Sequence, residues 1–296
     1  MPFEVVDLFC GVGGLTCGIR QAGFDVVAGF DNDKTCEYTY SHNNNTVFHC
    51  RNIKEVSGNE ISECYSDGAQ KILVGCAPCQ PFSTMSYKRF VKSPRENDAK
   101  YDLLSEFGRL IIEVKPVIVA MENVPELKNS EVFQRFVDVL KSEGYYTDGG
   151  HVVYCPDYGI PQNRHRFILL ASKIGEIALI PPTHNRKKVT VRPFIESLPP
   201  IAAGEIYEFD KLHRTATLSE TNLKRIRASV PGVLKNPQNP IKISNFRTFL
   251  GVLSSIFRLN RLFSFVFLAN FRFQNNFQTK IIPKTIPIFI AVFKKI

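Results

Sequence analysis

The feature that most constrains the fold of this chain is an alternation of short apolar runs with helical patterns over residues 1–175. Several of the runs are apolar throughout, which is typical of strands buried on both faces of a sheet. The pattern predicts helices at Leu15–Ala22, Leu103–Val114 and Glu131–Glu143, and strands at Phe3–Phe9, Asp25–Phe30, Ile72–Gly75, Val117–Met121, Val152–Tyr154 and Phe167–Ala171. We therefore predict a doubly wound α/β sheet, a fold that binds its ligands at the carboxyl ends of the strands.

Two changes of pattern divide the chain into three predicted regions, 1–175, 176–232 and 233–296. In the middle region prolines interrupt the regular patterns. The last region contains 11 of the 24 Phe residues and has no His, Tyr, Cys, Met, Asp or Glu. Its strand-like pieces are too short to span a bilayer, and arginines interrupt its longest apolar stretch, so we expect no membrane association.

The charge of the chain is distributed unevenly. The formal net charge is +9, yet 13 of the 37 Lys and Arg residues and none of the 28 Asp and Glu residues follow Glu220. Residues 1–220 are therefore net acidic, and the overall charge alone does not indicate nucleic-acid binding. The chain begins with a strand pattern instead of a secretory signal, which predicts a cytoplasmic protein with reduced cysteines. Only Cys76 and Cys79 are close in sequence, and neither has further partners at ligand spacing, so we expect no metal.

The first chemical motif is the loop DLFCGVGGL, residues 7–15. Glycines between a strand and a helix let a ligand approach the backbone, and the helix N-terminus offers free N–H groups. Asp31 follows the next predicted strand, where a carboxylate can accept hydrogen bonds from both hydroxyls of a ribose. Thr16 stands where a dinucleotide fingerprint has its third Gly, which disfavours a nicotinamide dehydrogenase. The alternative is a tight turn that needs Gly for structural reasons alone.

The second motif is GCAPCQPFS, residues 75–83, directly after a predicted strand. Pro78 and Pro81 flank Cys79, and a stiff loop that presents a thiol suits a nucleophile that must meet its target in one geometry. The alternative is a buried structural cysteine. Cys76, which continues the apolar strand, fits that alternative well, whereas Cys79 does not.

Two further motifs bring charge to the predicted sheet. Glu122, in MENV, ends an apolar strand, where a carboxyl group is costly to bury unless it is paired or protonated. Arg164 and Arg166, in QNRHR, alternate, so on an extended segment they share a face and can hold an anion or a carboxylate. The alternatives are a surface Glu that caps a loop and two solvated arginines.

Together and in this order, the four motifs resemble those of the DNA (cytosine-5)-methyltransferases, which have Phe-x-Gly-x-Gly, Pro-Cys-Gln, Glu-Asn-Val and Gln-x-Arg-x-Arg. The match covers roughly residues 3–175. The resemblance implies a Rossmann-like fold dependent on S-adenosyl-L-methionine, with residues 1–175 as the catalytic domain and 176–232 as an incomplete target-recognition region. It also implies double-stranded DNA as substrate and, in a restriction-modification system, a cognate restriction endonuclease as partner.

The resemblance further implies roles for individual residues. The cofactor would contact Phe9, Gly11, Gly13, Leu15, Asp31, Asn32, Asn52, Ile53 and Pro78. The family prefers Asp at the position of Asn52, but the carbonyl oxygen of Asn can still accept a hydrogen bond from the adenine amino group. DNA would contact Gln80 and Ser83 in the Cys79 motif, and Lys88, Arg89, Lys92 and Arg95 in the basic stretch that follows it.

The chemistry implied by the family uses four of these side chains. Cys79 would attack carbon 6 of a flipped-out cytosine, so that carbon 5 can take the methyl group. Glu122 would hydrogen-bond or protonate ring nitrogen 3. Arg164 and Arg166 would position Glu122 and the base.

The chain departs from the family pattern after Gly232. Family members continue with an Arg-rich helix motif and a closing Gly-Asn motif, and neither occurs here. We interpret residues 233–296 as the product of a truncated or frame-shifted gene; the alternative is a genuine basic and hydrophobic subdomain. Two other functions stay open, a tRNA cytosine-5 methyltransferase on the same fold and an inactive family member that binds only cofactor or DNA.

Overall fold

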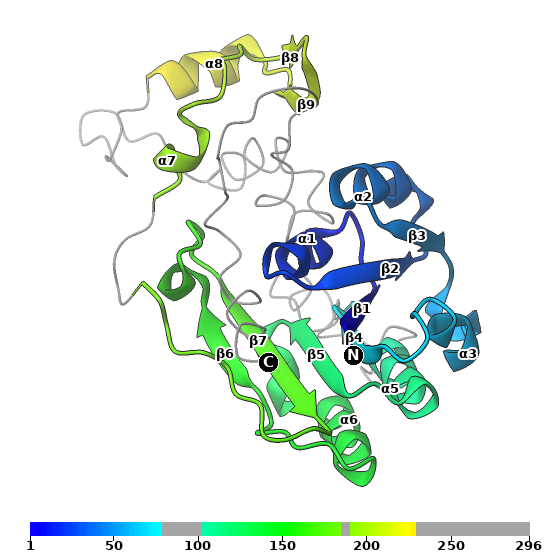
Figure 1. The fold of residues 1–296 in the computed structure, drawn as a ribbon. Coiled ribbons are helices and arrows are strands. Elements are labelled where there is room, and N and C mark those ends of the chain that lie inside the picture. The colour runs from blue at the N-terminus through cyan, green and yellow to red at the C-terminus, as the bar shows by residue number, and fades with distance from the viewer. Residues whose placement is uncertain (79–101, 185–189, 229–296) are drawn as a thin grey trace. The chain divides into compact units, whose positions relative to one another are not determined.

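The structure is a computed structural model that describes residues 1–78, 102–184 and 190–228 (Figure 1). The described residues up to Arg192 belong to one compact unit, and those from Pro193 belong to a second. The predicted tail, residues 233–296, lies outside the described residues.

The first unit contains a seven-stranded sheet with the order β3-β2-β1-β4-β5-β7-β6. Its strands are β1 (Phe3–Leu8), β2 (Asp25–Asp31), β3 (Val47–Cys50), β4 (Gln70–Gly75), β5 (Ile118–Asn123), β6 (His151–Tyr154) and β7 (His165–Ser172). All pairs from β3 to β5 are parallel, whereas β7 runs antiparallel to both β5 and β6. On one side of β1 the sheet continues with β2 and β3, and on the other side it continues with β4 and β5. Ligands of such sheets bind at the carboxyl ends of the strands next to this reversal of strand order. The predicted α/β, Rossmann-like fold is confirmed.

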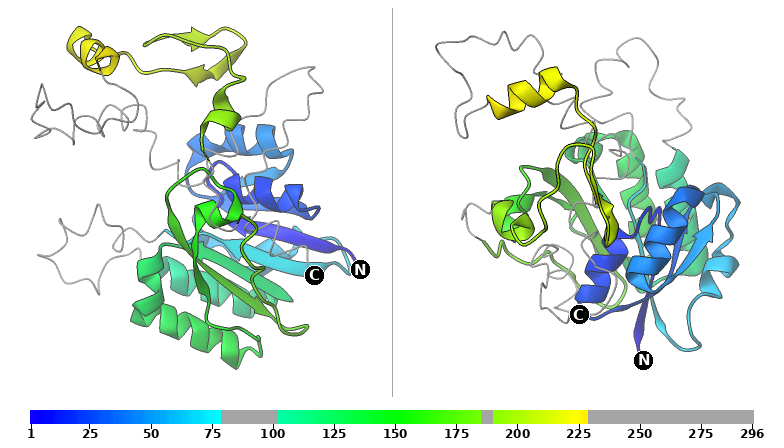
Figure 2. Two further views of the ribbon diagram at one scale, coloured as in Figure 1. Left: turned by 90° about the vertical axis from the view of Figure 1, so that its left-hand side faces the viewer. Right: turned by 90° about the horizontal axis from the view of Figure 1, so that it is seen from above.

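Helices cover both faces of this sheet. Figures 1 and 2 show α5 (Asp102–Val114) and α6 (Glu131–Ser142) on one face and α1 (Gly14–Gln21) on the other. The main apolar core lies on the α5–α6 face, where alternate strand residues such as Leu8, Leu73 and Met121 pack against these helices. Residues of the opposite parity, Asp7 and Glu122 among them, therefore point to the other face. The alternation separates the apolar core from the polar groups of the candidate site.

The remaining elements of the first unit are short. They are the helices α2 (Glu37–Asn44) and α3 (Gly58–Ser62) and the 3₁₀ helices η1 (Lys34–Cys36), η2 (Ile53–Glu55), η5 (Pro125–Asn129) and η6 (Cys155–Tyr158). The sequence patterns predicted neither α2 nor β3, because α2 is mostly polar and β3 has only four residues. Strand β5 extends two residues beyond its predicted end at Met121, because Glu122 and Asn123 pair with β7.

The second unit is small in its described part. It has the antiparallel pair β8 (Ile206–Tyr207) and β9 (Asp210–Arg214) and the helix α8 (Glu220–Arg227), which Ser219 caps. Helix α7 (Arg192–Ile195) begins at the boundary between the units. Within the described ranges, no helix is long and apolar enough to cross a membrane.

Candidate active site

The glycine loop joins β1 to α1 at the carboxyl edge of the sheet. Phe9, Gly11 and Gly13 all have positive φ angles, 57°, 51° and 88°. A Cβ atom on Gly13 would lie 2.2 Å from Nδ2 of Asn44, whereas one on Gly11 would meet nothing within 4 Å. Gly13 is thus required by packing against α2, while the backbone at Gly11 faces open space. The loop therefore fits both interpretations of the motif. Gly13 is needed for structural reasons, whereas Gly11 leaves room for a ligand beside the backbone.

Asp31 ties the end of β2 to this loop. Its Oδ2 accepts a hydrogen bond from the Gly11 N–H at 2.8 Å, and its Oδ1 accepts one from the Asp33 N–H at 2.9 Å. An ionised carboxylate has about four acceptor positions, so it can accept further donors beside these two. The neighbouring Asn32 is exposed. The structure therefore presents a polar acceptor next to the open face of Gly11.

The third strand of this edge leads to Asn52. The main-chain N–H of Arg51 donates to the carbonyl oxygen of Asp31 at 2.9 Å, which brings Asn52 close to the end of β2. Asn52 is exposed, and its Oδ1 accepts the Lys54 N–H at 3.3 Å while its Nδ2 donates to Glu55 at 3.1 Å.

The apolar residues expected at the cofactor lie deeper in the fold. Leu15 and Ile53 are almost completely buried, and Phe9 packs against the core. The polar groups of this edge therefore come from the loop backbone, Asp31 and Asn52. The three apolar side chains are part of the packing beneath the loop.

Glu122 and Arg166 form a nearly buried ion pair on the α1 face of the sheet. Glu122 lies opposite Ile168 in the β5–β7 ladder, so Arg166, two residues before Ile168, is its diagonal neighbour. Arg166 Nε lies 2.5 Å from Glu122 Oε1, and the two side chains are only 11% and 8% exposed. Arg164 comes just before β7 and is partly buried. The structure thus brings the predicted residues Arg166 and Glu122 together.

Burial dominates the electrostatics of this pair. It raises the pKa of Glu122 above its ordinary value, although Arg166 and a hydrogen bond with Cys76 act in the opposite direction. Burial and the nearby Glu122 carboxyl group also raise the pKa of the Cys76 thiol well above its usual range. Cys76 is therefore a neutral thiol, whereas Glu122 binds a proton more readily than an ordinary glutamate.

The stem of the Cys79 loop leaves the sheet beside Glu122. The buried side chain of Asn123 donates from Nδ2 to the carbonyl oxygen of Ala77 at 3.0 Å, which joins the ends of β5 and β4. Pro78 is exposed and is the last described residue before the loop. Cys79 lies outside the described residues. So do the predicted DNA contacts, which are Gln80, Ser83, Lys88, Arg89, Lys92 and Arg95. The sequence motifs did not predict a role for Asn123, although an amide side chain that is buried after an apolar strand needs hydrogen-bond partners.

A second polar network lies behind the glycine loop. Asp7 is buried, its Oδ2 accepts from Thr16 Oγ1 at 2.7 Å, and Thr16 Oγ1 lies 3.0 Å from the Tyr40 hydroxyl. Burial raises the pKa of Asp7 to about 7. Thr16, which replaces the third Gly of the dinucleotide fingerprint, thus links β1 to α2. In the described ranges, no group of three or more His, Cys, Asp or Glu side chains is placed to hold a metal ion.

Comparison with known proteins identifies the family. Residues 3–244 match the model of the C-5 cytosine-specific DNA methylases. The chain belongs to this family. It is 48% identical over 236 residues to the type II methylase M.HgiDII of Herpetosiphon aurantiacus, an alignment that covers 78% of this chain and 65% of the relative. The type II methyltransferase M.XorII of Xanthomonas oryzae pv. oryzae is 33% identical over 182 residues, which is 57% of this chain and 40% of the relative.

Solved structures of related methyltransferases have the same fold. A candidate DNA modification methyltransferase encoded within an E. coli prophage matches with a TM-score of 0.58 at 26% identity, over 69% of this chain and 57% of that one. The Entamoeba histolytica methyltransferase EhMeth matches with a TM-score of 0.53 at 24% identity, over 68% and 62% of the two chains. The chain thus spans less than two thirds of the length of each of these four proteins.

Proposed function

We propose that this chain transfers a methyl group from S-adenosyl-L-methionine to carbon 5 of a cytosine in duplex DNA. The observation that carries the proposal is the nearly buried Glu122–Arg166 pair, located where the stem of the Cys79 loop leaves the sheet. A carboxyl group with a raised pKa at this edge holds a proton more readily than an ordinary glutamate, and it can share or donate that proton. The family provides the reaction that needs such a group.

The residues at the other strand ends fit the cofactor. The open face of Gly11 admits a ligand close to the backbone, and Asp31 can accept hydrogen bonds from ribose hydroxyls. Asn52 presents an amide oxygen for the amino group of adenine. When bound, S-adenosyl-L-methionine supplies an electrophilic methyl group on a sulfonium.

The protein side chains activate the base. The Cys79 thiolate forms a bond to carbon 6 of a cytosine flipped out of the duplex, and the ring electrons displaced by that bond make carbon 5 nucleophilic. Glu122 donates a hydrogen bond or a proton to ring nitrogen 3, where negative charge would otherwise develop. Arg166 keeps the Glu122 carboxyl group in one orientation. After methyl transfer, water takes the carbon-5 proton, the electrons of that C–H bond restore the double bond between carbons 5 and 6, and Cys79 leaves as a thiolate. Any proton given to ring nitrogen 3 returns to Glu122.

The proposed partners follow from the relatives. M.HgiDII and M.XorII are named as type II enzymes, which supports a cytoplasmic protein in a restriction-modification system with a cognate endonuclease. Lys88, Arg89, Lys92 and Arg95 would contact DNA phosphates, and each such contact adds about −0.9 to the logarithmic salt slope of binding.

The test measures transfer of a tritiated methyl group to mixed-sequence duplex DNA by wild type, Cys79→Ala and Cys17→Ala. Cys17, on α1, is a matched control because it is a partly exposed thiol outside the candidate site. We expect incorporation by wild type and Cys17→Ala and none by Cys79→Ala. Duplex DNA that contains 5-fluorocytosine should trap a covalent complex with the first two proteins, because fluorine cannot leave as a cation. Incorporation into tRNA but not DNA would overturn the proposed substrate, and the absence of incorporation into either would overturn the proposed activity.

A further inference from the structure

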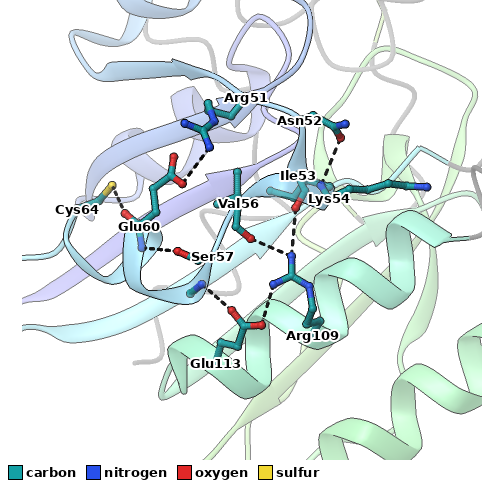
Figure 3. Close-up of polar contacts among 11 residues, drawn as sticks. Arg51, Asn52, Ile53, Lys54, Val56, Ser57, Glu60, Cys64, Arg109 and Glu113 are labelled. Atoms are coloured by element: carbon teal, nitrogen blue, oxygen red, sulfur yellow. Dashed lines mark hydrogen bonds and ion pairs between the residues drawn. The ribbon is translucent and has the colours of Figure 1, made fainter.

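Arg109, on α5, reaches across to the turn that follows β3. Its Nη2 donates to two main-chain carbonyl oxygens, those of Ile53 at 3.2 Å and Val56 at 2.9 Å (Figure 3). These carbonyls lie in and directly after η2, and that of Ile53 also accepts the main-chain N–H of Val56 at 3.4 Å. One guanidinium group therefore joins both ends of η2 to a long helix of the core.

Two carboxylates hold Arg109 in this position. Its Nε contacts Glu106 at 2.7 Å and its Nη1 contacts Glu113 at 2.7 Å, both within α5. Glu113 also accepts the Gly58 N–H through its second oxygen, at 2.6 Å. A Cβ atom on Gly58 would lie 2.3 Å from the Glu113 Cβ, so the turn approaches α5 as closely as glycine permits. Arg109 and Glu113 together hold the segment from Ile53 to Gly58.

The other side of the same turn carries Asn52. The orientation of its amide is determined by two neighbours in η2. The Lys54 N–H faces Oδ1 (Figure 3). The Glu55 carboxylate faces Nδ2. The Arg51 N–H in turn anchors the start of the segment to Asp31. Movement of η2 away from α5 would displace both neighbours of Asn52 and allow its amide to rotate.

We propose that Arg109, assisted by Glu113, is a positioning residue that determines which end of the Asn52 amide faces the cofactor, and hence selects adenine at that site. The inference rests on the proposed function, in which Asn52 lies beside the adenine amino group. Hydrogen bonds to charged groups are about twice as strong as neutral ones, and an arginine fork can contact carbonyls and carboxylates at the same time. A lysine at this position keeps the charge but has one nitrogen in place of three.

The test compares binding of two ligands by calorimetry. S-adenosylhomocysteine has the adenine amino group, and S-inosylhomocysteine has an oxygen in its place. The proteins are wild type, Arg109→Lys and Glu113→Gln, with Arg135→Lys as control. Arg135 is a matched control because its pair with Glu131, at 3.8 Å on α6, is exposed and also spans four residues of one helix.

We expect wild type to bind S-adenosylhomocysteine more tightly than the inosine analogue. Arg109→Lys should reduce this preference about three- to tenfold, the value of one hydrogen bond, and Glu113→Gln should reduce it less. Arg135→Lys should retain it. If Arg109 had a purely structural role, its substitution would weaken the binding of both ligands equally and leave the ratio of their dissociation constants unchanged.

The outcomes separate the two proposals. An unchanged ratio in both variants, beside a wild type that discriminates, would overturn the positioning role and leave the proposed function intact. Equal affinity of wild type for both ligands would overturn the proposed recognition of the adenine amino group by Asn52, and the inference with it. No binding of either ligand by folded wild type would overturn the cofactor site of the proposed function. If Arg109→Lys does not fold, the ratio measured for Glu113→Gln decides.

Discussion

The buried carboxyl group of Asp7 should make the stability of this chain decrease, not increase, as pH rises from acidic to neutral values. Its pKa is about 7 in the folded chain, against an ordinary value of 3.8. Between these values the folded protein binds a proton that the unfolded protein has released. A raised carboxyl pKa therefore contributes stability below about pH 4, and that stability is lost as pH rises toward 7.

The size of this effect follows from the same two pKa values. They differ by roughly three units, and each unit corresponds to about 1.4 kcal/mol. The free energy of unfolding should thus lose on the order of 4 kcal/mol from this group between pH 4 and pH 8. Asp7→Asn keeps the shape and an acceptor for Thr16 but does not titrate, so this loss should be absent in the variant.

Urea unfolding at a series of pH values measures the difference. The chain has no Trp, so circular dichroism at the helical band is the suitable signal. Asp138→Asn, which removes an exposed carboxylate from α6, controls for the change in net charge. Stability curves of Asp7→Asn and Asp138→Asn that run parallel from pH 4 to pH 8 would refute the reasoning.

Three further predictions concern the site itself. Glu122→Gln should lower kcat by about 10²- to 10⁴-fold, because an amide cannot donate a proton to the base; single-turnover methylation measures this, and a loss below about tenfold would contradict it. Asn123→Ala should leave the buried carbonyl of Ala77 without its partner and lower the free energy of unfolding by about 1–3 kcal/mol; urea titration unchanged from wild type would exclude this contact as a stabilising one. Gly13→Ala should be more destabilising than Gly11→Ala in thermal unfolding. Both substitutions strain a positive φ at a cost of about 1–2 kcal/mol, but only Gly13 also has buried atoms in the way, so equal melting temperatures would argue against the packing explanation.

Much of the fold was predictable because the inner strands are buried on both faces. Runs such as Ile72–Gly75 have no other plausible environment, and they correspond to β4 and its neighbours. The direction of β7 was not predictable, because residue patterns do not differ between parallel and antiparallel pairing of a buried strand. Helix α2 was hidden by its polar composition. Its main buried side chain, Tyr40, fits only because Gly29 has no Cβ, which would lie 2.2 Å from the Tyr40 hydroxyl.

The site was predictable where a motif concentrates unusual residues and obscure where the partners are distant. Glu122 and Arg166 stand out because charged groups adjoin apolar strands, and the structure brings them together. Their chemical roles remain predictions. Arg109 and Glu113 look in the sequence like an ordinary pair on the surface of a helix. Only the fold places Ile53 and Gly58, about 55 residues away, within their reach.

The reversed direction of β7 gives the two members of the Glu122–Arg166 pair unequal local stability. The ladder between β5 and β7 ends at Asn123 and Phe167, so the backbone of Arg166 lies beyond it and is in register with Val153 of β6. Strand β6 is a four-residue edge strand, and short edges open far more often than a whole sheet unfolds. Amide hydrogens around Arg166 should therefore exchange with solvent sooner than those around Glu122. The carboxyl group thus lies on a strand inside the sheet, and its counter-charge lies at the end of β7, where the edge strand β6 supplies the backbone pairing.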